Sequence, residues 1–321
     1  ISAPGPGSGK MATALSQLYH DSKRGINAGY AKYETFPVWN LPLKHPVNLA
    51  YEAATVDLED VNMIDPFHLE AYGKTAVNYN RDVQTFPLLK AIFEKIYGKS
   101  PYQSPTDMGV NMVGFAIKDE EAACQASKEE IIRRYYQAKK FNYLGKFKDS
   151  AVDLEEMLMN QLHLSVNDRK CVAACMKKTE ASGVPCMALD LGGKKIVTGK
   201  RSRLFGSAAA VLLNALKVLA KIDDSIPLIS PNVIEPIQKL KVESLNNHNP
   251  RLHAEEVLIA LAIQANTNPL AELALAQLPK LKGCQAHSSA ILQEVDLNAF
   301  NKLGIAVTEE PVSYAHRLYA K

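Results

Sequence analysis

The sequence lacks a long apolar run, a strong excess of one charge and a cysteine framework. No stretch approaches the roughly 20 consecutive apolar residues of a membrane helix, so we predict no membrane partner. Lysine and arginine total 37 against 34 acidic residues, and a net charge of +3 is too small to indicate nucleic acid as a partner. The five cysteines have no framework spacing, which predicts free thiols in a reducing compartment. Because no charged-then-apolar leader is found, we expect a cytoplasmic protein.

What is present is the composition of a globular chain. The 321 residues are 47% hydrophobic and 22% charged, which is enough for a sizeable core in one large domain or two domains. The patterns predict a mixed α/β fold in three parts. These parts are an α/β region with a glycine loop over 1–117, a helical module over 118–182 and a C-terminal α/β subdomain over 183–321.

The first stretch of the chain runs from a short strand through a glycine-rich turn into a helix expected over 10–24. Successive backbone N–H groups converge in such a turn, and the positive end of the following helix adds to them. This order predicts a binding site for a phosphate or a nucleotide. The residues that would hold the phosphate are Gly5, Gly7, Ser8, Gly9 and Lys10.

The loop departs from the phosphate loop of nucleotidases at two positions. Pro4 stands where the first glycine belongs, and Met11 stands where a hydroxyl would bind magnesium. Thr13 lies two residues later, on the helix. We therefore expect an anion site without its own magnesium; the alternative is a tight turn whose glycines serve packing alone. Because the strand before the loop is nearly absent and no initiator methionine is present, we also expect the chain to be the C-terminal part of a longer protein or a processed product.

A long irregular stretch follows a strand expected over 30–36, and its short helices are expected near 47–58, 67–73 and 83–97. It is dense in hydrogen-bonding side chains, and long ordered loops are often functional. We predict that it forms the wall of a pocket, with His68 as a candidate catalytic residue; loops packed over a sheet are the alternative. The candidate residues of this wall include His45, Asp65, His68, Glu70, Asn78, Asn80 and Arg81.

The next part reads as helices over 118–145, 149–164 and 168–181, with solvated charged faces. Cys171 and Cys175 lie one helical turn apart without matching partners, so they are interpreted as core residues and not as metal ligands. Two strands, 186–191 and 195–198, are then joined by Gly192 and Gly193, which is typical of a hairpin. A buried helix over 206–222 follows.

Basic residues precede that buried helix and form a second candidate anion site. A helix start and nearby guanidinium groups attract anions by the same argument as the glycine loop, and a solvated hairpin end is the alternative. The residues are Lys200, Arg201, Arg203 and Ser207.

A third set of residues near the C-terminus has zinc-ligand chemistry. His253 and Glu255 open a helix expected over 253–265, and Cys284 and His287 follow about thirty residues later. The pattern is similar to the zinc deaminase signature, in which a glutamate beside a histidine ligand transfers protons. It departs from that signature because Gly283 replaces a proline and His287 replaces a cysteine. A metal-free pocket is the alternative. Helices over 269–278 and 297–303 and strands over 288–294 and 305–309 are expected around it.

Long motifs in the sequence resemble a bacterial family of domains of unknown function, family 1846. The resemblance spans essentially the whole chain. It is carried by Ala3-Pro-Gly-Pro-Gly-Ser-Gly-Lys10, Glu34-Thr-Phe-Pro37, Trp39 to Thr55, Asn62 to Tyr72, Ala76-Val-Asn-Tyr-Asn-Arg-Asp82, Ser104 to Asn111, His253-x-Glu-Glu-Val-Leu and Gly283-Cys-x-Ala-His287. It implies an α/β fold with a helical insert, an additional α/β region ahead of the glycine loop and a deaminase-like C-terminal topology. Some members carry an ATP-dependent peptidase label, but the family implies no established catalytic residues.

Three functional hypotheses remain open from the sequence. The preferred one is an enzyme or enzyme-like protein that binds a phosphorylated small molecule or nucleotide through the glycine loop. The second is a zinc-dependent hydrolase or deaminase-like enzyme with His253, Cys284 and His287 as ligands and Glu255 as general acid/base; zinc is expected as a cofactor only here. The third is a non-catalytic assembly protein. We also expect a homo-oligomer.

Overall fold

The computed structural model describes residues 1–2, 7–111, 113–193 and 195–313. They form two compact units, of which the first is Ile1–Ile131 with Leu154–Leu162 and the second is Ile132–Asp153 with the chain from His163 onward. The long helix α7 (Glu120–Tyr143) contributes to both units, as does α8 (Asp149–Gln161). The fold is mixed α/β, as the sequence predicts. The finer division into three parts stays a prediction.

Unit 1 is built from helices and short paired strands. Strand β1 (Lys32–Tyr33) pairs in parallel with β4 (Gly109–Val110), and β2 (Asn62–Ile64) pairs antiparallel with β3 (Val77–Tyr79). Its other elements are α1 (Lys10–Lys23), α2 (Pro46–Ala54), the 3₁₀ turn η1 (Val56–Leu58), α3 (Pro66–Tyr72), α4 (Asn80–Tyr97), α5 (Pro105–Met108) and α6 (Val113–Ala116).

The core of unit 1 lies between α1 and α4. Leu18 of α1 packs with three residues of α4, Phe86, Leu89 and Phe93, and all four are buried. The predicted helix over 10–24 is confirmed. Helix α1 begins at Lys10, as predicted, and ends at Lys23, one residue earlier than predicted. The strand expected over 30–36 is paired only at Lys32 and Tyr33.

Unit 2 contains a four-stranded sheet in the order β6-β5-β7-β8. Strand β5 pairs antiparallel with both β6 and β7, while β7 and β8 run parallel. The strands are β5 (Cys186–Asp190), β6 (Ile196–Lys200), β7 (Gln285–Ser288) and β8 (Ala306–Glu309). The helical elements of this unit besides α7 and α8 are η2 (Val166–Asp168), α9 (Lys170–Ser182), α10 (Ser207–Ala220), α11 (Pro231–Lys239), the π-helical η3 (Leu240–Ser244), α12 (Ala254–Ala265), α13 (Pro269–Leu275), η4 (Leu278–Leu281) and α14 (Glu294–Lys302).

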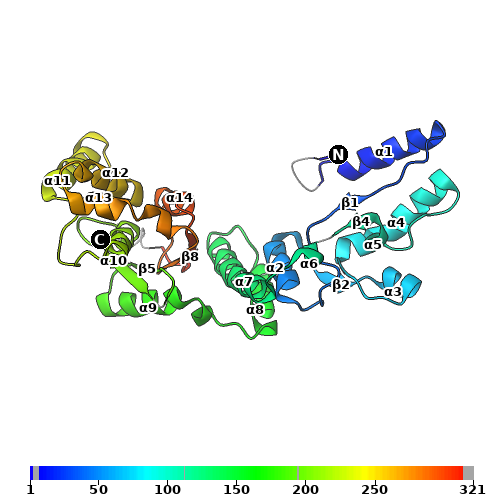
Figure 1. Ribbon diagram of the computed structural model, residues 1–321, viewed down its shortest axis with the longest axis horizontal. Helices are drawn as coiled ribbons and strands as arrows, with labels where there is room; N and C mark the ends of the chain where they lie inside the picture. The colour runs from blue at the N-terminus through cyan, green and yellow to red at the C-terminus, as the bar shows by residue number, and fades with distance from the viewer. Residues whose placement is uncertain (3–6, 112, 194, 314–321) are drawn as a thin grey trace. The chain divides into compact units, whose positions relative to one another are not determined.

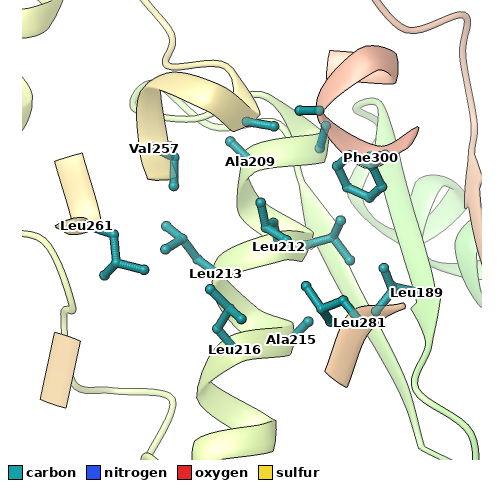
Figure 2. Packing of buried hydrophobic residues seen from close by; sticks show 14 of the residues in the cluster. Leu189, Ala209, Leu212, Leu213, Ala215, Leu216, Val257, Leu261, Leu281 and Phe300 are labelled. Carbon is teal, nitrogen blue, oxygen red and sulfur yellow. The ribbon is translucent and has the colours of Figure 1, made fainter. Parts of the chain in front are cut away.

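Helices cover both faces of this sheet (Figure 1). Side chains alternate along a strand, so Met187 and Leu189 of β5 face the cluster around α10, while Cys186 and Ala188 face α9. Figure 2 shows Leu212 and Leu216 of α10 among residues of α12, α14 and the sheet. The predicted hairpin, the buried helix and the core position of Cys171 and Cys175 are confirmed.

The prediction of a strand over 288–294 is wrong. The paired residues are Gln285–Ser288, and the chain leaves the sheet at Ser288, whose Oγ donates to the carbonyl of Ala290 at 2.7 Å. Because β7 is buried on both faces and contains no β-branched residue, its sequence gave no strand signal. The apolar residues that follow lie in a loop before α14.

Candidate functional site

The described part of the glycine loop of unit 1 has a left-handed backbone at both of its glycines. Gly7 and Gly9 have φ values of 72° and 84°, and Gly9 is the N-cap of the 14-residue helix α1. The first turn of α1 carries no acidic residue. The Lys10 ammonium donates to Ser8 Oγ at 3.1 Å, so both side chains lie at the helix start. Gly5 lies outside the described residues.

Thr13 is engaged within the helix. Its Oγ1 donates to the carbonyl of Gly9 at 3.1 Å, and its N–H bonds to the same carbonyl at 3.0 Å. The Thr13 hydroxyl is therefore used within the first turn of α1, and the anion site without a magnesium ligand stays a prediction.

Most candidate residues of the irregular stretch hold its loops together. Asn80 accepts from the N–H of Val61 at 3.2 Å and donates to the carbonyl of Glu59 at 3.2 Å. Arg81 is paired with the buried Asp60 at 2.7 Å. These contacts order the loops, as expected for structural groups.

His68 and Asp65 belong to a second set of loop contacts. Asp65 caps α3 through the N–H groups of Phe67 and His68, at 3.0 and 3.1 Å, and accepts from Thr106 Oγ1 at 2.6 Å. His68 Nδ1 lies 3.1 Å from Ser104 Oγ. The structure therefore places His68 in contact with a helix cap, and its catalytic role stays a prediction.

His45 lies in a cluster with Glu120 and Cys124. Within the described residues these three are the one His/Cys/Asp/Glu group whose ligand atoms all lie within 4.8 Å of one another. His45 Nε2 is 2.5 Å from Glu120 Oε1 and 3.6 Å from Cys124 Sγ. Burial, and then Glu120, raises the pKa of the Cys124 thiol, which disfavours the thiolate that metals bind.

The tautomer of His45 also disfavours metal binding at Nε2. Its Nδ1 accepts the N–H of Val47 at 3.2 Å and caps α2, so the ring proton is on Nε2, which donates to Glu120. A metal on Nε2 requires that proton on Nδ1, where it would face the N–H of Val47.

We therefore expect protein purified without chelator to contain substoichiometric zinc. Metal analysis of the wild type beside Cys124→Ser measures this, and Cys284→Ser is the matched control. One zinc per chain that disappears only in Cys124→Ser would contradict the tautomer argument.

A buried network of charged groups lies beside β1. The Lys32 ammonium is 2.9 and 2.7 Å from the two carboxylate oxygens of Asp82 and 2.5 Å from Glu34 Oε1, and it also contacts the Tyr79 hydroxyl. Burial, opposed by Lys32 and reinforced by Asp82, raises the pKa of Glu34 to about 7. Burial alone would lower the pKa of Lys32, but Glu34 and Asp82 outweigh it and raise that pKa. This network was not predicted from the sequence.

In unit 2 the structure brings the basic turn and the start of α12 together. Arg251 Nε donates to the carbonyl of Ser202 at 2.7 Å, and the N–H of Gly206 donates to the carbonyl of Leu252 at 3.1 Å. Phe205 and Leu252 also form a parallel bridge. Two of the four sequence-predicted sets of residues are therefore neighbours, the one that ends at Ser207 and the one that begins at His253.

His253 is oriented by an aspartate that the sequence did not point to. Its Nδ1 lies 3.0 Å from Asp296 Oδ2, and Asp296 Oδ1 accepts the N–H of Ala254 at 2.8 Å. The side chains of His253 and Asp296 are 11% and 9% exposed. Glu255, in contrast, is paired with Lys302 at 2.8 Å on the surface. The carboxylate that contacts the imidazole ring of His253 is thus Asp296 and not Glu255.

The remaining predicted zinc ligands, Cys284 and His287, face opposite sides of β7. Cys284 belongs to the core around α10 and donates to the carbonyl of Lys280 at 3.7 Å. His287 is fully buried and lies 2.8 Å from Thr308 Oγ1 and 3.3 Å from Glu310 Oε1. Burial lowers the pKa of His287 despite Glu310. Within the described part of the chain, the ligand atoms of His253, Cys284 and His287 do not all lie within 4.8 Å of one another.

These features define a mixed α/β protein with a glycine loop before a helix in one unit and a carboxylate–histidine pair in the other. The chain matches the family models for the N-terminal and C-terminal parts of the domain of unknown function DUF1846 over residues 1–163 and 167–319. It belongs to the DUF1846 family.

Its relatives are bacterial proteins named UPF0371. One from Streptococcus pyogenes serotype M5 is 59% identical over 321 residues, which is 100% of this chain and 65% of the relative. One from serotype M6 is 60% identical over 319 residues, and one from Streptococcus equi subsp. zooepidemicus is 58% identical over 319 residues; 99% of this chain and 65% of each relative are covered. The chain thus spans about 65% of the length of these relatives. Among the described residues, no helix is both long and apolar enough to span a bilayer.

Proposed function

We propose that this protein binds a phosphorylated small molecule or nucleotide through the loop Gly7-Ser8-Gly9-Lys10. The observation that carries the proposal is the left-handed backbone of Gly7 and Gly9 directly before α1. A Cβ added at either glycine would meet none of the described residues within 4 Å, so packing does not require glycine there. The backbone conformation requires it instead.

That conformation suits an oxyanion. A left-handed residue between two others turns successive N–H groups toward one side, and the helix start adds partial positive charge on the same side. The Lys10 ammonium supplies a full charge at the helix start. Because Met11 offers no hydroxyl and Thr13 bonds to Gly9, the loop supports anion binding better than magnesium-dependent hydrolysis.

We expect Lys10→Ala to weaken ligand binding by about 1.5–3 kcal/mol, the usual loss of a charge-assisted hydrogen bond. Isothermal titration of the whole chain with a panel of nucleotides and sugar phosphates measures it. Lys23→Ala is the matched control, because it removes the same charge at the other end of α1. Absence of binding across the panel, or equal affinities of the two variants, would refute the proposal.

A further inference from the structure

A cavity of unit 2 lies between α7, α8 and the segment that follows β8. Its volume is about 360 Å³, within the roughly 300–1,000 Å³ that is usual for small-molecule sites. Residues at spacings i, i+3 and i+4 share one face of a helix, and each of the two helices lines the cavity with such a set. The sets are Lys139, Asn142 and Tyr143 of α7, and Asp149, Val152 and Asp153 of α8.

The one cation of this lining, Lys139, is held in place by its surroundings. Its Nζ lies 5.1 Å from the ring centroid of Tyr135 and 5.9 Å from that of Tyr136. Behind it, Glu310 lies 3.3 Å from Nε2 of the buried His287 and accepts a hydrogen bond from the buried Tyr136. Hydrogen bonding to His287, opposed by burial and reinforced by Lys139, lowers the pKa of Glu310. The ionised Glu310 thus keeps the ammonium of Lys139 at the cavity.

Two carboxylates of α8 share this cavity with Lys139. Asp149 Oδ1 accepts from Asn142 Nδ2 at 2.7 Å, so the turn between the two helices orients it. Asp153 lies one helical turn further along α8. Among the described residues, the side chains of Lys139 and Asp153 have no hydrogen-bond or ion-pair partner. Both charges are therefore available to a ligand.

The third side of the cavity is apolar and fixed to the sheet. The N–H of Glu310 donates to the carbonyl of Ser288 at 2.9 Å, and the N–H of Ile291 donates to the carbonyl of Val312 at 2.9 Å. Pro311, between these two anchored residues, lines the cavity. An apolar group of a ligand can therefore pack against a surface that does not have to be ordered on binding.

We propose that this cavity binds a free α-amino acid with an apolar side chain. Lys139 binds the carboxylate of the amino acid, and Asp149 and Asp153 bind its ammonium group. The apolar side chain packs against Pro311. A phosphate dianion is disfavoured because two carboxylates line the same cavity.

A metal ion fits these carboxylates less well than an organic cation does. Within the part of the chain that the structure describes, the one set of ligand atoms close enough together for a metal is in unit 1. Asp149 and Asp153 have no third acidic, histidine or cysteine ligand near enough to complete such a set. The proposed site lies wholly in unit 2 and is independent of the glycine loop.

The test is isothermal titration of the whole chain in three arms. The first arm uses leucine and phenylalanine. The second uses isocaproate and hydrocinnamate, which lack the amino group, and the third uses isoamylamine and phenethylamine, which lack the carboxylate. We expect at least one of the two amino acids to bind. Each of its two analogues should bind about tenfold or more weakly, because each loses one charge-assisted contact.

Two variants with matched controls assign the contacts. Lys139→Met and Asp153→Asn should each weaken binding of the amino acid about tenfold or more. Asp153 is exposed, so its variant tests the site without disturbing the fold. Lys178→Met and Glu180→Gln remove the same charges from the exposed surface of α9, and they should bind as the wild type does. Lys10→Ala should also leave this binding unchanged.

Three results would overturn the proposal. The first is that neither leucine nor phenylalanine binds. The second is that an analogue with a single charge binds as tightly as its amino acid. The third is that Lys139→Met and Asp153→Asn bind the amino acid as tightly as their controls on α9 do.

Discussion

Replacing Gly199 with alanine should lower the free energy of unfolding of unit 2 by about 3 kcal/mol, the upper part of the usual range for overpacking. A Cβ at this position of β6 would lie 2.2 Å from the backbone nitrogen of Val211, 2.6 Å from its Cα and 2.7 Å from the carbonyl carbon of Ala210. These are backbone atoms of α10, so no rotamer change can remove the clash. The helix would have to move away from the sheet.

Such a movement is costly because α10 is buried by the rest of unit 2. Leu212 and Leu216 are fully buried in the cluster of Figure 2, and a shift of the helix would open space around them. Urea unfolding followed by circular dichroism measures the loss.

Gly206→Ala is the matched control, because its Cβ would lie 3.7 Å from the Leu252 carbonyl oxygen, an ordinary contact. Gly206 is the N-cap of α10, where alanine is less favourable than glycine, so this variant should cost about 1 kcal/mol. Equal stabilities of the two alanine variants would show that α10 does not approach β6 as described.

Replacing Lys32 with methionine should destabilise unit 1 by about 3 kcal/mol, which is the lower end of the usual range for removing one partner of a buried ion pair. The lower end applies because the Lys32 side chain is 31% exposed and the solvent screens part of the interaction. Without the ammonium, Glu34 and Asp82 would remain close together with no cation between them. Trp39, the single tryptophan of the chain, lies in unit 1 and reports its unfolding by fluorescence.

The loss should depend on pH in a definite direction. The native-state pKa of Glu34 is raised from 4.5 to about 7, so the folded protein holds this proton more tightly than the unfolded chain does. The contribution of Glu34 to stability therefore falls as pH rises between these two values. Lys32 stabilises the ionised form of Glu34, which is the main form near pH 8 but not near pH 5. The Lys32→Met variant should therefore lose less free energy of unfolding near pH 5 than near pH 8.

Lys44→Met is the matched control, because Lys44 is exposed in the same unit. Its free energy of unfolding should stay within about 0.5 kcal/mol of the wild type. A Lys32→Met penalty that does not change between pH 5 and pH 8 would contradict the described network.

The elements that the sequence predicted well are those with strong local signals. Helix α1 follows a glycine turn and ends near Gly25, and the β5–β6 hairpin is marked by Gly192 and Gly193. Local backbone preference is enough to place such elements. The short strand β7 has no such signal, because its pattern reflects burial on both faces by elements distant in the sequence.

The residues of the candidate sites also divide into those that the local sequence indicates and those that only the folded structure brings together. His253 and Ser207 were singled out because their residue types and helix-start positions are visible in the sequence. Asp296 was not, because it lies 43 residues from His253 and reaches it only through the packing of α14 against α12. The Lys32 network likewise joins residues about 50 positions apart. Contacts between residues this far apart in the sequence cannot be predicted from the spacing of residues along the chain.

The buried cysteines of unit 2 and the single tryptophan of unit 1 give each unit its own reporter. The thiols of Cys171, Cys175, Cys186 and Cys284 are buried in unit 2, and burial raises the pKa of Cys171 to about 11 and that of Cys175 to about 12. They can be alkylated only when unit 2 opens, because a protonated, buried thiol does not react. The alkylation rate of these four thiols therefore reports how often unit 2 opens. The fluorescence of Trp39 reports the unfolding of unit 1. The two stabilities can thus be measured separately in one unmodified chain.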